Sequence, residues 1–123
     1  MTTTVLPSLY DRLGGSAAVN AAVDLFYRKV LTDDRIQHFF NDVDMKTQIG
    51  KQKKFLVYAF GGPAKYDGKD MRRAHEHLDL NEEHFGAVAE HLQATLEELN
   101  IPGELIEQVM AIAASTHDDV LNL

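Results

Sequence analysis

Apolar residues recur at steps of three and four along most of the chain, which is the spacing of one face of an α-helix. The segment 16–30 shows this best, because its apolar residues include Val19, Val23, Phe26, Tyr27 and Val30. No segment shows sustained alternation of apolar and polar residues, so strands are not expected. The pattern therefore predicts an all-α fold.

Small polar residues and glycines indicate where the helices begin and end. Ser16 is expected to cap the helix that follows Gly14 and Gly15, and Asn81 the helix that carries Phe85 to Leu99. Residues 61–69 combine glycine, proline and charge, which predicts a surface loop. The other expected helices are 9–13, 33–40, one from Asp42 or Asp44 to residue 61, a short one from Asp70 past His75, and one that includes 105–113.

Composition limits the class of protein. A length of 123 residues predicts a single domain over 1–123. The 12 basic and 19 acidic residues give a net charge of −7, which disfavours nucleic acid and anionic membranes as partners. The chain has no cysteine, so disulfides and thiolate metal sites are excluded. No apolar run approaches about 20 residues, and we expect a cytoplasmic monomer.

Several catalytic patterns fail on spacing. Residues 62–70 resemble a phosphate-binding loop but have one residue too many between the glycines, and Asp70 stands where a hydroxyl is needed. No serine lies in a Gly-x-Ser-x-Gly motif. His75 and His77 are two residues apart and point in opposite directions on a helix, so they cannot share one metal ion. No histidine follows a glutamate by three positions, which argues against a di-iron bundle.

The segment 44–60 departs from an ordinary amphipathic helix. One of its faces mixes two amides and an amine with apolar residues, namely Gln48, Lys51, Gln52, Phe55 and Ala59. A solvated pair of helical turns explains this face as simply as a ligand site does. The residues alone leave both interpretations open.

Six short motifs lie at residues 9–15, 23–27, 38–40, 58–62, 71–75 and 119–122. In this order, and over nearly the whole chain, they resemble the motifs of the group I truncated haemoglobins. The resemblance implies a two-over-two helical sandwich around one haem b per chain. It also implies that the two glycine pairs, at 14–15 and 61–62, reverse the chain after a helix.

The resemblance also implies the residues of the site. His75 matches the proximal iron ligand, and a neutral imidazole suits haem iron. Tyr27 matches the tyrosine that donates a hydrogen bond to bound oxygen. The remaining matches are Gln48 and Gln52 as polar distal residues, and Phe40 and Phe55 as rings that pack on the macrocycle. Eight of the 12 basic residues lie between Lys46 and Arg73, where propionates would find cations.

Two departures from the family pattern bear on mechanism. Lys51 stands where some relatives have a distal histidine, and lysine binds iron in certain other members, so Lys51 is a candidate second metal ligand. Its amine must first lose a proton from a reference pKa of about 10.4. His117 lies one place after the position of a histidine that some relatives attach to a haem vinyl group; Thr116 stands at that position. The other four histidines, His38, His77, His84 and His91, are expected to face solvent.

The resemblance implies binding of O2, NO and similar small ligands. Oxidation of nitric oxide to nitrate, or protection from reactive nitrogen and oxygen species, is the leading expected activity, and an unidentified reductase would then recycle the iron. Storage or delivery of oxygen is the alternative within the haem class. A cofactor-free helical interaction module is the alternative outside it.

Overall fold

The computed structural model describes residues 7–62 and 71–123 of the chain. No strand occurs in these two ranges, which confirms the expected all-α class. Most of the expected 61–69 loop, and of the segment that resembles a phosphate-binding loop, lies outside them. The helices are α1 Leu9–Leu13, α2 Gly15–Val30, the 3-10 helix η1 Gln37–Phe40, α3 Met45–Ala59, α4 Met71–His75, α5 Glu82–Glu98, α6 Gly103–Ala114 and α7 His117–Leu121.

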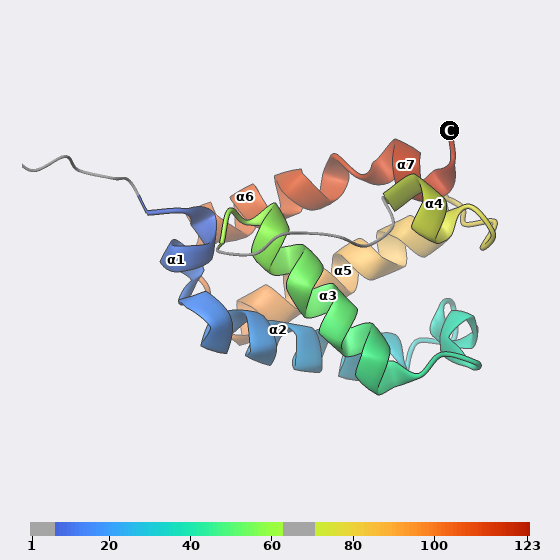
Figure 1. The fold of residues 1–123 in the computed structure, drawn as a ribbon, viewed down its shortest axis with the longest axis horizontal. Helices are drawn as coiled ribbons and strands as arrows, with labels where there is room; N and C mark the ends of the chain where they lie inside the picture. Colours follow the sequence, from blue (N-terminus) through green and yellow to red (C-terminus); the bar gives the residue numbers. More distant parts are fainter. Residues whose placement is uncertain (1–6, 63–70) are drawn as a thin grey trace, which may run out of the picture.

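The longer helices form two packed pairs (Figure 1). One pair is α2 with α3, and the other is α5 with α6. Packing of α2 on α5 joins the pairs, while α1 lies against α2 and α6. The short helix α4 lies against α7 near the C-terminal end of the described chain (Figure 1).

The core forms around one face of α2. Val19, Val23, Tyr27 and Val30 are all buried, and their spacing of four, four and three residues places them on that single face. Ile36 and Ala87 bury against the same cluster, so the loop after α2 and the helix α5 share this core. The expected helical periodicity of 16–30 is therefore confirmed.

The helix caps agree with the sequence in one case and differ in another. Asn81 caps α5, as expected, and the side chain of His84 accepts a reciprocal bond from the main-chain N–H of Asn81. The expected Ser16 cap is wrong, because α2 already begins at Gly15. Gly14 reverses the chain there with a φ of 118°, a conformation that a residue with a Cβ rarely adopts.

The chain leaves α3 through a close contact with α1. The main-chain N–H of Tyr10 donates to the carbonyl of Phe60 at 2.9 Å. A Cβ on Gly62 would lie 2.7 Å from Val57 Cγ1 and 2.8 Å from the ring of Tyr10, so a larger residue does not fit there. This contact fastens the end of α3 to the beginning of the chain.

None of the helices within 7–62 and 71–123 combines the length and the apolar character needed to cross a membrane.

One buried hydroxyl yields a test of the packing between α2 and α5. Thr95 is fully buried, and its Oγ1 has no hydrogen-bond partner among the described residues. Thr95→Val keeps the shape of the side chain and removes this unpaired group, so we expect the free energy of unfolding to rise by about 1 kcal/mol. Urea unfolding of the haem-loaded protein measures the difference.

Thr95→Ser is the matched control, because it keeps the hydroxyl and removes the methyl group. It is expected to lower stability by about 1 kcal/mol through the small cavity it leaves. A Thr95→Val protein less stable than wild type would show that the hydroxyl is satisfied.

Candidate functional site

A polar pair, with one member buried and the other half-buried, joins α2 to α3. Gln48 Nε2, on α3, donates to the hydroxyl of Tyr27, on α2, at 3.1 Å. Tyr27 is 4% exposed, and this burial raises the pKa of its phenol, while the bond from Gln48 lowers it by less. The phenol therefore stays neutral. Because its oxygen accepts from Gln48, its proton is free to be donated to another group.

Aromatic rings surround this pair. Phe40, at the end of η1, meets the ring of Tyr27 edge to face with the centroids 5.8 Å apart. The ring of Phe26, the residue before Tyr27 on α2, also lies edge to face with the Tyr27 ring, with the centroids 5.2 Å apart. The structure thus brings three predicted site residues, Tyr27, Phe40 and Gln48, into contact.

The other predicted residues of α3 lie along the same helix. Gln52 and Phe55 are half-buried, one and two turns after Gln48, whereas Lys51 is exposed. No residue of α3 is fully buried, although the helix is 15 residues long. Among the described helices its closest neighbour is α2. Leu56 and Ala59 also pack on the cluster of Phe60, Leu96 and Val109, so the C-terminal end of α3 lies against α5 and α6 as well.

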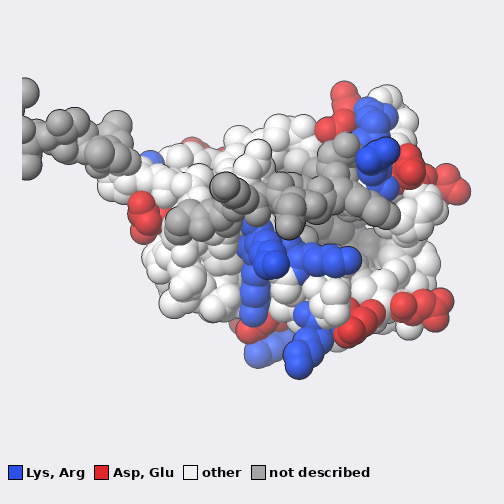
Figure 2. All heavy atoms as spheres, in the orientation of Figure 1, with Lys and Arg blue, Asp and Glu red and all other residues white. Residues whose placement is uncertain are grey.

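His75 is the last residue of α4 and is half-buried. Among the described helices, its helix packs most closely against α7. Figure 2 shows the surface hollowed between the basic side chains over α3 and those over α4. The hollow therefore separates the helix that carries the two glutamines from the helix that carries the imidazole.

The walls of this region suit a flat apolar group. Phe85, Val88 and Leu92 fall on one face of α5, yet Val88 is 38% exposed. An exposed apolar side chain at Val88, a helix without buried residues and an imidazole on a separate helix together fit haem, whose ring needs apolar walls and whose iron needs a nitrogen ligand. α3 carries four lysines and no acidic residue. Lys53 pairs with Asp24 at 3.4 Å, and the positive charge of the helix suits the propionates.

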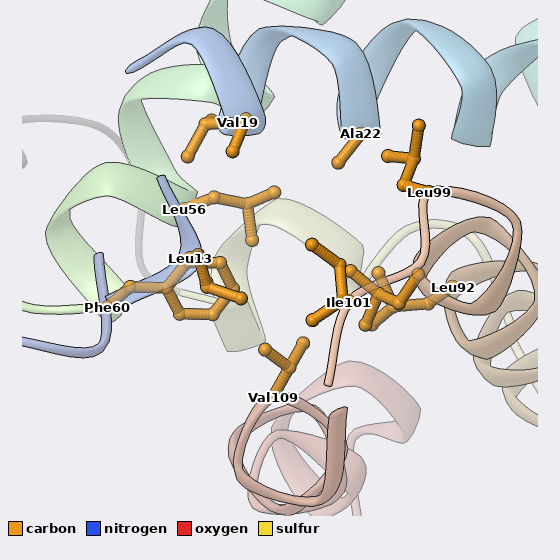
Figure 3. A pocket seen from close by; sticks show the side chains of 11 residues that line it. Leu13, Val19, Ala22, Leu56, Phe60, Leu92, Leu99, Ile101 and Val109 are labelled. Carbon is orange, nitrogen blue, oxygen red and sulfur yellow. The ribbon is translucent and has the colours of Figure 1, made fainter. Parts of the chain in front are cut away.

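An apolar cavity of about 20 Å³ lies elsewhere, among α1, α2, α3, α5 and α6 (Figure 3). This volume is that of a single water molecule, and without polar groups such a space stays dry. It is a gap in the packing and is far too small for a macrocycle. The side chains around it include Val19, Leu56, Phe60, Leu92, Leu96 and Val109.

Two histidines that were expected in solvent are half-buried and bonded. His91 Nε2 lies 2.6 Å from Asp33 Oδ2, and Arg35 also bonds that carboxylate. The hydrogen bonds from Arg35 hold the pKa of Asp33 well below its usual range. His84 takes part in the cap of α5. His38 and His77 are exposed, as expected.

His117 connects α7 to the start of α5. Its Nε2 lies 2.8 Å from Glu82, its Nδ1 lies 2.9 Å from Asp118, and its ring meets Phe85 edge to face. The carboxylates of Asp118 and then Glu82 raise the pKa of the imidazole. Both ring nitrogens therefore have protein partners here.

The four longer helices form two crossed pairs. Tyr27 and Gln48 lie on one side of the hollow, and His75 lies on the other. This arrangement defines a globin of the shortened, two-over-two type. The sequence matches the family described as bacterial-like globin over residues 8–122. The chain therefore belongs to this family. Globins are haem proteins, so the expected haem cofactor is confirmed.

Individual relatives agree over almost the full length. The chain is 57% identical to the group 1 truncated hemoglobin GlbN of Synechocystis sp., with 95% of this chain and 99% of the relative covered. It resembles the crystal structure of the Synechococcus sp. 2/2 hemoglobin with covalently attached heme, at a TM-score of 0.91, 47% identity, and 95% and 100% coverage. It also resembles the crystal structure of the truncated hemoglobin from Tetrahymena pyriformis, at a TM-score of 0.90 and 43% identity, with 94% of this chain and 98% of that chain covered.

The bonds of His117 predict a pH-dependent contribution to stability. Because its pKa is raised in the folded protein, this contribution is complete below the unfolded value near 6.5 and is lost as the pH rises through the folded value. His117→Gln is therefore expected to lower the melting temperature at about pH 5.5 more than at about pH 9.

His77→Gln, which replaces an exposed histidine, is the control for His117→Gln. Its melting temperature should follow that of wild type across the same range. Equal losses for His117→Gln at both pH values would contradict the assigned contacts.

Proposed function

We propose that the chain is a single globin domain over 1–123 that binds one haem b through His75 and oxidises nitric oxide to nitrate. The observation that carries this proposal is the Tyr27–Gln48 hydrogen bond. Haem, when bound, supplies an iron atom that takes diatomic gases such as O2 and NO as ligands. We also propose that the protein is monomeric and cytoplasmic.

The role proposed for Tyr27 is to donate a hydrogen bond from its hydroxyl to bound oxygen, which carries a partial negative charge. Gln48 orients that hydroxyl by donating to its oxygen, and burial keeps the phenol neutral. Gln52, one turn further along α3, is proposed as a second donor. Phe40 and Phe55 are proposed to pack on the ring, and Phe40 also holds Tyr27 in place. Slow release of oxygen follows from these contacts.

Slow release favours oxidation over transport. Nitric oxide, O2 and one electron give nitrate, so each turnover needs an electron from a reductase that remains to be identified. Storage or delivery of oxygen requires release on the time scale of demand. A buried, preoriented donor at Tyr27 therefore favours the enzymatic role.

Rapid mixing tests this function. The oxygenated protein should give stoichiometric nitrate with nitric oxide, and Tyr27→Phe should release O2 about 10- to 100-fold faster, because one hydrogen bond to a charged group is lost. Tyr58→Phe, at a tyrosine that is 53% exposed on α3, is the control and should behave as wild type. If no nitrate forms, the enzymatic role is wrong.

Lys51 is proposed as a displaceable distal ligand. Its position on α3 lies one turn after Gln48 and one turn before Phe55, two of the proposed site residues. The side chain is exposed in the structure, so its amine must turn inward and lose its proton before it can bind iron. Ligation should therefore strengthen as the pH rises.

Optical titration of the ferric protein tests this role. Wild type should convert to a six-coordinate low-spin spectrum as the pH rises from neutral to alkaline, and Lys51→Ala should not make the same change. Lys54→Ala, one turn further along the exposed surface of α3, is the control. Identical spectra for Lys51→Ala and wild type throughout would exclude lysine as a ligand.

A further inference from the structure

The helix that carries His75 is attached to the molecule at few points. α4 has five residues and its close neighbour is α7, whereas its contacts with the other described helices are sparse. A helix of this length gains little stability from its own hydrogen bonds, so its position depends on the element against which it packs. The placement of His75 is therefore a property of α7 as much as of α4.

Arg72 makes the polar contacts between these two helices. Its Nη2 donates to the main-chain oxygen of Leu123 at 2.9 Å, and its Nε donates to Asp119 Oδ1 at 3.3 Å. One guanidinium thus bonds both α7 and the residue that follows its cap, in the forked geometry that arginine provides. Arg72 lies one helical turn before His75 on α4.

The second contact of α7 is with α5. His117 bonds Glu82, and its ring packs edge to face on Phe85. α7 also packs directly on α5. A continuous set of contacts therefore runs from the core helix α5 through α7 to Arg72 and then to His75.

We propose that Arg72 is a positioning residue for the iron ligand: by fastening α4 to α7 through Asp119 and Leu123, it sets where the His75 imidazole stands. This inference rests on the proposed role of His75. Without the contacts of Arg72, α4 still lies against α7 but loses two hydrogen bonds that restrict its sliding and rotation. The imidazole then approaches the iron in a broader range of orientations.

The experiment uses the full chain loaded with haem. Arg72→Gln and Asp119→Ala, singly and together, are compared with wild type, and Arg28→Gln is the control because it removes an exposed arginine from α2. Resonance Raman spectra of the ferrous protein measure the iron–imidazole stretching band. Transfer of haem to excess apomyoglobin measures how firmly the ring is held.

Arg72→Gln should shift and broaden the iron–imidazole band and speed haem transfer by about fivefold, the upper end for an exposed ion pair. Asp119→Ala should move both readouts in the same direction and by less, because the bond to Leu123 remains. In the double variant the effects should be less than additive, since each substitution alone already breaks the same Arg72–Asp119 contact. Arg28→Gln should match wild type.

The proposal is overturned if Arg72→Gln leaves the band and the transfer rate at wild-type values. It is also overturned if Arg72→Gln speeds transfer but leaves the position and width of the iron–imidazole band unchanged, because Arg72 would then act on the haem propionates and not on the placement of His75. His75→Gly tests the proposed iron ligand separately from the role of Arg72. If that variant keeps the wild-type band, His75 is not the ligand and the proposed function fails with it.

Discussion

The structure depends most on the apolar face of α2. Its buried residues, from Val19 to Val30, provide the surface on which α1, α3 and α5 all pack. The same face carries Tyr27, so the residue that is proposed to bind oxygen is also part of the core. Burial keeps its phenol neutral, and Phe26 and Phe40 pack edge to face on its ring. Core packing and site chemistry are therefore set by one helix.

Local patterns predict most of the helices, but they give no helix for α7, and the helix expected over 33–40 is only the 3-10 helix η1. The three- and four-residue spacing predicted α2, and Asn81 predicted the beginning of α5, because both signals lie within one or two turns of chain. The Ser16 cap is wrong, since two consecutive glycines let the helix begin at Gly15, two residues earlier than it would after a cap at Ser16. His91 was misplaced because its partner, Asp33, is 58 residues away and no local pattern reports that contact.

The site was predicted through motifs and not through spacing. The face of 44–60 was equally compatible with solvent, and the motif order favoured a haem site. The Tyr27–Gln48 bond supports that interpretation with a distance that the sequence could not supply. Arg72 had no assigned role, because its value lies in contacts with α7, 47 and 51 residues later in the chain. Only the spatial arrangement of the short helices reveals that connection.

The lack of buried residues on α3 has a consequence for the life of the protein in a cell. No residue of α3 is buried, and the haem that is proposed to pack on Phe55 binds only the folded state, so it stabilises that state by mass action. We expect α3 of newly made chains to be open to proteolysis until haem binds. The supply of porphyrin would then govern how much of the globin accumulates.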